Sequence, residues 1–143
     1  TGAFDSTNNK VVIAYTDAAD TQDGQAFVCT VSGTSISAGS IATFDTNNVT
    51  DVSTVFDSNA GKIVISYRDP PTGNGPGTSI VGTVSGTNIS FGSKVVFDST
   101  YTYGITSVFD SSSNKVTILI VSYLTLKQTS LYFFTKLMVI QRL

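Results

Sequence analysis

Apolar and polar residues alternate along much of this chain with the two-residue period of β-strands. The segment 62–68 reads Lys-Ile-Val-Ile-Ser-Tyr-Arg, so that Ile63, Ile65 and Tyr67 share one face. Val64 makes the opposite face largely apolar as well. We therefore expect an interior strand here, covered on both sides.

The same pattern recurs at a fixed spacing. A Phe-Asp-Ser triplet, a short polar turn, a lysine and an apolar strand begin at Phe4, Phe56 and Phe109, so the steps are 52 and 53 residues. A constant period of this size indicates a repeat architecture. The first two copies keep the pattern throughout, whereas the third follows it only to Ile118.

Each repeat is predicted to form four antiparallel strands joined by short turns. In the second repeat the strands are residues 51–56, 62–68, 78–84 and 89–97. The first turn of each copy opens on an Asp suited to an Asx turn and closes on a residue type that tolerates positive φ. These pairs are Asp5 and Asn9, Asp57 and Gly61, and Asp110 and Asn114. A glycine inside the fourth strand, Gly39 or Gly92, predicts a β-bulge.

Four-stranded meanders repeated about every 50 residues are typical of β-propeller blades. We therefore predict an all-β, propeller-like array of four-stranded antiparallel blades, with a β-sandwich as the alternative all-β fold. The predicted units are an N-terminally truncated blade at 1–50, a second blade at 51–104, the start of a third at 105–118 and an atypical tail at 119–143. Because propellers typically close with about 4–8 blades, we expect a longer chain, an oligomer or an incompletely closed fragment.

The composition changes abruptly after Ile118. All six leucines lie beyond it, whereas all ten aspartates and all twelve glycines lie before Leu119. Five basic and ten acidic residues precede Leu119, a net charge of −5, and the tail adds three basic residues and no acidic one. We predict that this tail is not genuine blade sequence. It is expected to pack poorly and to expose Leu131, Phe133, Phe134 and Leu137, and its apolar runs are too short for a transmembrane helix. The alternative is that residues 119–126 extend the second strand of the third repeat and residues 130–140 form one more strand.

Missing residue types exclude several kinds of chemistry. The chain has no His, Trp or Glu, which excludes Ser-His-Asp and Cys-His catalysis and the common zinc motifs within these residues. The net charge is −2 without a basic cluster, so nucleic acid is not an expected partner. The single Cys29 lies in an apparent strand and is predicted to be a buried thiol. We predict a protein that is not an enzyme and holds no cofactor.

The candidate ligand site lies in the second half of the chain. Tyr101 and Tyr103 occupy a predicted loop, and exposed loop aromatics stack on sugar rings or anchor protein partners. A locally packed loop is the alternative interpretation. Arg68 and Asp69, where the second strand of the second repeat ends, are included in the candidate site.

Asp17, Asp20 and Asp23 form a weaker candidate, for calcium. Calcium loops place oxygen ligands two residues apart, whereas these aspartates are three apart. The equivalent loop of the next repeat keeps only Asp69. We therefore predict a solvated loop and no metal site.

The repeat also resembles a known group of sequences. Its two parts are Phe-Asp-Ser-x-x-x-Lys-Val-Val-Ile-x-Tyr and, downstream, Val-Ser-Gly-Thr-x-Ile-Ser-x-Gly, within residues 4–118. They resemble repeats of large uncharacterised proteins of aquatic bacteria, their phages and some marine animals, which are read as β-propeller blades of extracellular or phage tail-fibre-like proteins. The third copy departs from this pattern at Leu119, and Ile120 replaces the tyrosine of the other copies.

The resemblance implies a non-enzymatic binding or adhesion module that presents loops to a glycan or protein, outside the cell or on a cell or virion surface. Two alternatives stay open: part of a propeller-fold glycan hydrolase or lyase whose catalytic residues lie elsewhere, and a structural fibre or stalk repeat. Besides the ligand, the expected partners are further blades of the same chain or other copies through self-association.

Overall fold

A computed structural model describes the protein over residues 1–19, 21–69, 75–124 and 132–140, with side chains as far as residue 121. Every regular element within these residues is a β-strand. The strands are β1 (Gly2–Asp5), β2 (Lys10–Asp17), β3 (Asp23–Ser32), β4 (Ser35–Ala38), β5 (Ala42–Asp45), β6 (Thr50–Asp57), β7 (Lys62–Arg68), β8 (Gly77–Ser85), β9 (Asn88–Phe91), β10 (Val95–Asp98), β11 (Thr102–Asp110), β12 (Lys115–Leu124) and β13 (Tyr132–Ile140). No helix in the described part of the chain is long and apolar enough to cross a membrane.

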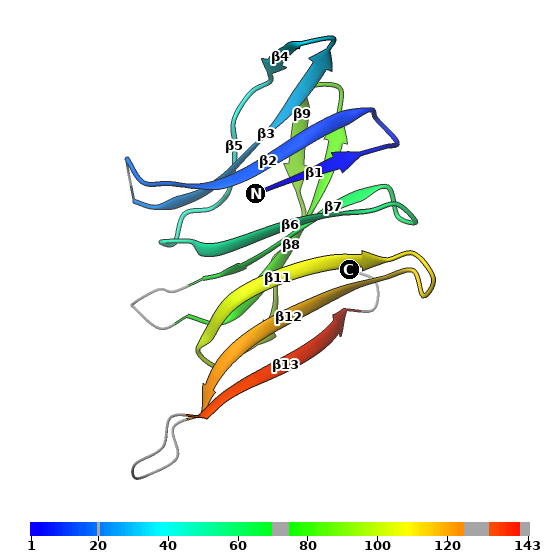
Figure 1. The fold of residues 1–143 in the computed structure, drawn as a ribbon. Helices are drawn as coiled ribbons and strands as arrows, with labels where there is room; N and C mark the ends of the chain where they lie inside the picture. The colour runs from blue at the N-terminus through cyan, green and yellow to red at the C-terminus, as the bar shows by residue number, and fades with distance from the viewer. Residues whose placement is uncertain (20, 70–74, 125–131, 141–143) are drawn as a thin grey trace.

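The strands form three antiparallel sheets that follow one another along the chain (Figure 1). In the first sheet, β1, β2 and β3 lie side by side, and β4 and β5 both pair with β3. The second sheet repeats this arrangement with β6, β7 and β8, and β9 and β10 both pair with β8. The third sheet contains β11, β12 and β13. The predicted all-β class and the antiparallel pairing of the strands are confirmed.

The first turn of each sheet has the predicted geometry. The φ angles are 53° at Asn9, 64° at Gly61 and 54° at Asn114. In the second sheet, Oδ1 of Asp57 accepts hydrogen bonds from the backbone N–H groups of Asn59 and Ala60, both at 2.9 Å. Asp5 and Asp110 accept two backbone N–H groups in the same way in the other sheets. The repeated aspartates are therefore turn-forming residues.

The predicted bulge in the fourth strand is present, but it splits the strand in two. The single strand expected over 89–97 is instead β9 and β10, separated by residues 92–94. In the first sheet, Cys29 faces Ala38 while Ala26 faces Ala42, so three residues lie opposite two. The N–H of Gly92 donates to the carbonyl of Val81 at 3.0 Å within the equivalent break. Regular pairing thus stops over three residues.

Strand β7 is the interior strand of the molecule. All residues from Ile63 to Tyr67 are buried. Ile63, Ile65 and Tyr67 face a core shared with the first sheet. Val64 faces a second core, which it shares with Ile118 of the third sheet. The prediction of a strand covered on both sides is confirmed, and Cys29 is buried as expected.

The sheets meet along their first strands, because β6 lies against both β1 and β11. The hydroxyl groups of Thr1 and Thr54 are 2.8 Å apart, and the N–H of Ser107 donates to Oγ of Ser53 at 2.9 Å. The three sheets form an open row in the described part of the chain (Figure 1).

The backbone continues as strand beyond the change in composition. β12 extends to Leu124, and β13 pairs with it in antiparallel register from Tyr132 to Ile140. The side chains of Leu131, Phe133, Phe134 and Leu137 lie outside the described part, so their exposure stays a prediction.

Candidate functional site

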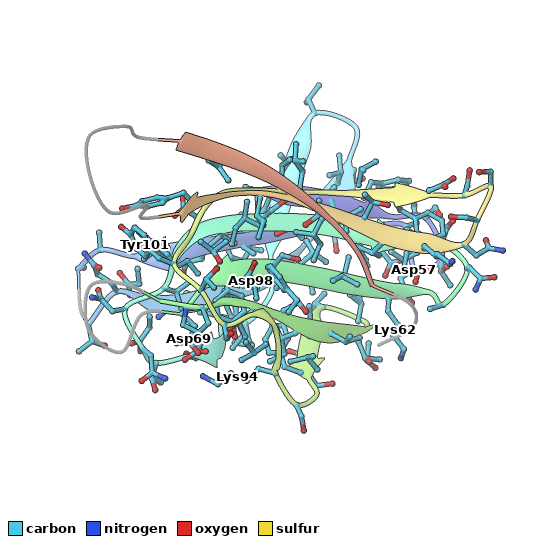
Figure 2. The ribbon with its side chains drawn as sticks, turned by 90° about the horizontal axis from the view of Figure 1, so that it is seen from below. Asp57, Lys62, Asp69, Lys94, Asp98 and Tyr101 are labelled. Carbon is cyan, nitrogen blue, oxygen red and sulfur yellow. The ribbon has the colours of Figure 1, made fainter. Side chains whose placement is uncertain are left out.

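Most candidate residues lie at one end of the sheets, which we call the connecting-loop end. Here residues 45–50 and 98–102 link one sheet to the next, and the second strand of a sheet is joined to the third. Figure 2 shows Asp69 and Tyr101 toward this end, and Asp57 and Lys62, which belong to a first turn, toward the other. Antiparallel connectivity causes this separation, since successive turns alternate between the two ends of a sheet.

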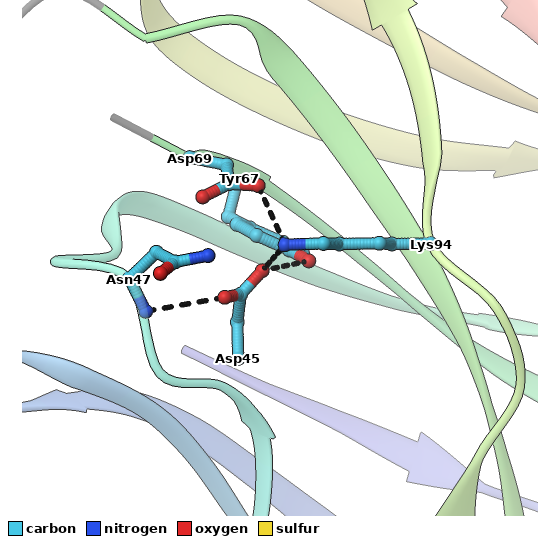
Figure 3. A network of polar contacts seen from close by, with 5 residues as sticks. All are labelled: Asp45, Asn47, Tyr67, Asp69 and Lys94. Atoms are coloured by element: carbon cyan, nitrogen blue, oxygen red, sulfur yellow. Dashed lines mark hydrogen bonds and ion pairs between the residues drawn. The ribbon is translucent and has the colours of Figure 1, made fainter. Parts of the chain in front are cut away.

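A group of four side chains, the lysine network, links the first two sheets at this end (Figure 3). Nζ of Lys94 lies 2.7 Å from Oδ2 of Asp45 and 2.8 Å from Oδ2 of Asp69. The hydroxyl of Tyr67 donates to the same oxygen of Asp45 at 2.9 Å. The other oxygen of Asp45 accepts the backbone N–H of Asn47 at 3.2 Å. The network thus consists of Asp45, Tyr67, Asp69 and Lys94.

Strand ends and the break in the fourth strand position these groups. Asp45 is the last residue of β5, and Asp69 directly follows β7. Lys94 lies in the break between β9 and β10. The interruption therefore places a long cationic side chain where two carboxylates from different sheets meet.

The network combines two buried carboxylates with one ammonium group. The side chains of Asp45 and Asp69 are 2% and 11% exposed, whereas that of Lys94 is 41% exposed. Burial lowers the pKa of Lys94, but the hydrogen bonds and charges of the two aspartates outweigh it, so the pKa lies above its usual value. Burial, followed by the charge of Asp45, raises the pKa of Tyr67. Lys94 is therefore a cation and Tyr67 a neutral donor at neutral pH.

An open depression of about 380 Å³ lies beside the lysine network. Its lining is Thr43, Phe44, Asp45, Thr46, Asn47, Ile80, Gly92 and Lys94. Phe44 and Ile80 belong to the core between the first two sheets, so only a small part of each side chain reaches the depression. Hydroxyl, amide, carboxylate and ammonium groups supply the polar part of the wall.

A second group, the arginine cluster, joins the second sheet to the third. Cζ of Arg68 lies 5.4 Å from the ring centre of Tyr101 and 4.9 Å from that of Tyr103. Nη1 of Arg68 donates to the Tyr101 hydroxyl at 3.2 Å, and the two rings meet edge to face at 4.1 Å. Nε donates to Oγ1 of Thr50 at 2.7 Å and lies 3.3 Å from Oδ2 of Asp51. The guanidinium is thus held by hydrogen bonds, charge and two aromatic rings.

Three of the four predicted ligand residues meet in the arginine cluster, and Asp69 lies in the lysine network instead. Tyr103 belongs to β11 rather than to a loop. Both tyrosines are half-buried against Arg68, an arrangement that matches the locally packed alternative. Their contacts anchor residues 98–104 to the end of β7, and a role in ligand binding stays a prediction.

Sequence reasoning missed Asp45 and Lys94. Asp45 and Asp98 are 53 residues apart and occupy equivalent positions of the two repeats. The repetition of an aspartate at this position could therefore have identified Asp45. Lys94 has Ile41 as its counterpart in the first repeat. A cation in place of an apolar residue is a departure from the repeat, and such departures mark positions with a local role.

The acidic loop of the first repeat is engaged in local hydrogen bonds. Asp17 accepts a backbone N–H and, at 3.2 Å, the side chain of Gln25. Asp23 accepts the hydroxyl of Thr21. Asp20 lies outside the described residues. Within the described part, no group of three His, Cys, Asp or Glu side chains is placed to hold a metal ion.

Comparison of the chain with protein-family models, with curated proteins and with solved structures finds no match.

Proposed function

We propose that this chain is a non-enzymatic binding or adhesion module, part of a propeller-like array that presents its connecting-loop end to a glycan. The observation that carries the proposal is the open depression beside the lysine network. Its volume of about 380 Å³ falls in the range of about 300–1,000 Å³ found for small-ligand sites.

The lining of the depression supports a sugar as the ligand. Asn47, Lys94 and Thr43 supply hydrogen-bond donors and acceptors for ring hydroxyls. Phe44 and Ile80, which are 7% and 4% exposed, add a small apolar part to the floor of the depression. The open shape of the depression suits a chain of sugars that projects from a larger surface.

The placement of the sheets supports a propeller-like array. Each of the first two sheets is a four-stranded meander whose fourth strand is interrupted, and β1, β6 and β11 lie next to one another. In a propeller, the first strands of successive blades surround the central channel, so their proximity is the expected relation.

The contacts of the carboxylates favour binding over hydrolysis. Glycan hydrolases of the common type use two carboxyl groups that flank the bond to be broken. Asp45 and Asp69 instead contact one ammonium group, Lys94, and Asp45 also accepts Tyr67 and a backbone N–H. Asp45 thus joins the first two sheets, and Asp69 holds the Lys94 side chain in place.

A pair of matched substitutions tests the proposal. Asn47 lines the depression, and Asn88 is an exposed asparagine where β9 begins, at the opposite end of the sheets. We expect immobilised neutral oligosaccharides to bind the protein, and Asn47→Ala to weaken binding about 10-fold through the lost hydrogen bonds. Asn88→Ala should leave the affinity unchanged.

Two results would contradict this function. Equal loss of affinity in both variants would place the ligand elsewhere, and an absence of binding to any oligosaccharide would remove the glycan as ligand. Shortened sugars released during incubation would show hydrolysis and overturn the non-enzymatic assignment.

A further inference from the structure

The first sheet exposes an apolar face, whereas the equivalent face of the second sheet is buried. We call the side of each sheet that carries Ile13, Ile65 or Ile118 its leading face. Ile36 lies on the leading face of the first sheet and is 71% exposed. Its counterpart 53 residues later, Ile89, is 6% exposed.

Two other residues on this face show the same contrast. Val31 is exposed and its counterpart Val84 is buried, although both occupy the third strand of their repeat. Tyr15 is half-buried, whereas Tyr67, at the equivalent place in the second strand, is fully buried. The two faces therefore have the same apolar design, and only the one on the second sheet is covered.

The structure shows what covers a leading face. We call the opposite side of each sheet, which carries Ala14, Ser66 or Leu119, its trailing face. Val12, Ala14 and Val28 of the first trailing face pack against the second leading face. The second trailing face, with Val64, packs in turn against Ile118 of the third leading face. At both interfaces between sheets, the trailing face of one sheet thus covers the leading face of the next.

In the part of the chain that the structure describes, the third sheet leaves its trailing face open. Leu119 is 36% exposed, although its counterparts Ala14 and Ser66 are fully buried. Val108 of β11 is also exposed, whereas its counterpart Val55 packs into the core between the second and third sheets. Within the described residues, the row of sheets therefore ends in one uncovered leading face and one uncovered trailing face.

We propose that copies of this chain associate head to tail, the trailing face of the third sheet in one copy covering the leading face of the first sheet in the next. The exposed leading face of the first sheet is thus covered by a second copy of the chain. That copy offers a trailing face, the same kind of surface that covers the leading faces of the second and third sheets. Contiguous exposed apolar surface of this kind marks an interaction site. The inference does not depend on the ligand of the connecting loops.

Charge favours this pairing over the association of two first sheets. Residues 1–45 contain five Asp and one Lys, a net charge of −4, whereas residues 102–143 contain four basic residues and one Asp, a net charge of +3. Two first sheets, each with a net charge of −4, would repel each other, whereas the described side chains of the third sheet, Asp110 and Lys115 among them, carry no net charge. The first repeat also has Ile41 in place of Lys94, so head-to-tail docking buries no lysine at that position without a counterpart of Asp45.

Such an interface is heterologous, because two different surfaces of the chain meet. Repetition of a heterologous contact generates a closed ring or an open filament, depending on the rotation between neighbours. Each copy contributes one leading face and one trailing face to the assembly. A substitution that disables either face should therefore block the addition of further copies.

Light scattering after gel filtration tests the inference over a dilution series from about 1 μM to about 1 mM protein. The wild-type chain should reach at least twice the monomer mass. Ile36→Asp and Leu119→Asp place a charge on the leading and trailing faces, and each should raise the dissociation constant at least about 100-fold. Val96→Asp, at an exposed apolar position of the second sheet, should have no such effect.

A mixture of the two single variants makes the test specific. The Ile36→Asp chain keeps its trailing face and the Leu119→Asp chain keeps its leading face, so together they should form one heterodimer and no larger species. Formation of that heterodimer also shows that both variants are folded. A wild-type chain that stays monomeric throughout would overturn the inference, as would a mixture that stays monomeric. Sensitivity to Ile36→Asp alone would show a symmetric contact between first sheets and overturn it too.

Discussion

Aspartate does two different kinds of structural work in this protein. Asp57 and its counterparts hold exposed turns by accepting backbone N–H groups on one oxygen. Asp45 is buried, and joins two sheets through Tyr67 and Lys94. The first role needs only local geometry and recurs in all three copies, whereas the second needs partners from the next sheet.

The turn aspartate of the third sheet predicts a loss of stability in acid. Hydrogen bonds from the hydroxyls and N–H groups of Ser112 and Ser113 hold the pKa of Asp110 below its usual value of 3.8. Because the pKa of Asp110 is lower in the folded than in the unfolded chain, the ionised carboxylate stabilises the fold above about pH 4. This stabilisation is lost as the pH falls through the folded-state pKa. We expect Asp110→Asn to flatten the decline in unfolding free energy below pH 4, as measured by urea denaturation at several pH values.

Ser113→Ala serves as the control for this effect, since it removes one hydrogen bond from Asp110 and keeps the carboxylate. Its pH dependence should fall between those of the wild type and Asp110→Asn. Identical pH dependence in all three proteins would assign the acid sensitivity to other carboxylates.

Removing the cation of the lysine network should destabilise the fold. Lys94→Met leaves Asp45 and Asp69 buried without their ammonium partner, which costs several kcal/mol for a fully buried pair. Since the lysine side chain is 41% exposed, solvent screens part of this loss, and we expect about 1–3 kcal/mol. Lys94→Arg keeps the charge and should cost less. Urea denaturation at neutral pH measures both, and equal losses would show that shape rather than charge matters here.

At the scale of elements, burial distinguishes strands whose sequences are nearly the same. β2 and β7 share the order of a lysine, three apolar residues, a small residue and a tyrosine. β7 has a packed sheet on each side, whereas β2 has one on its trailing side only. The contribution of one isoleucine should therefore depend on which copy carries it.

Two equivalent substitutions measure that difference. Ile65 is fully buried, so Ile65→Ala should cost about 2–5 kcal/mol, as expected for a large-to-small change in a core. Ile13, its counterpart, is half-buried, and Ile13→Ala should cost less than half as much in dilute, monomeric protein. Thermal and urea denaturation of both variants provide the comparison. Equal costs would mean that the leading face of the first sheet is already covered.

The sequence was most informative where structure is local and repeated. The turns closed by Asn9, Gly61 and Asn114 and the double burial of β7 follow from residue types and alternation, and both are observed. The lysine network could not be predicted in this way, because Lys94 occurs in one repeat only and its partners come from two sheets. Contacts between repeats depend on how the sheets are rotated, and alternation within a strand does not encode that rotation.

At the scale of the whole molecule, the second sheet is held from both sides and the outer sheets from one. The first strands lie together, and the cores on either side of β7 connect all three sheets. The described residues leave the row open, so whether the array closes depends on what docks at its two ends.

The hypothesis that residues 119–143 are not genuine repeat sequence leads to a prediction about cooperativity. Shortening the chain to residues 1–124 removes β13, which pairs only with β12 within the described residues. The first two sheets share a core that includes Ile63, Ile65 and Tyr67, all fully buried, and this core contains no residue of the third sheet. We therefore expect amides of residues 62–68 to keep their protection from hydrogen exchange in the shortened chain. If that protection falls as much as the protection of residues 115–121, the third sheet and its tail stabilise the whole row, and the tail is an integral part of the repeat array.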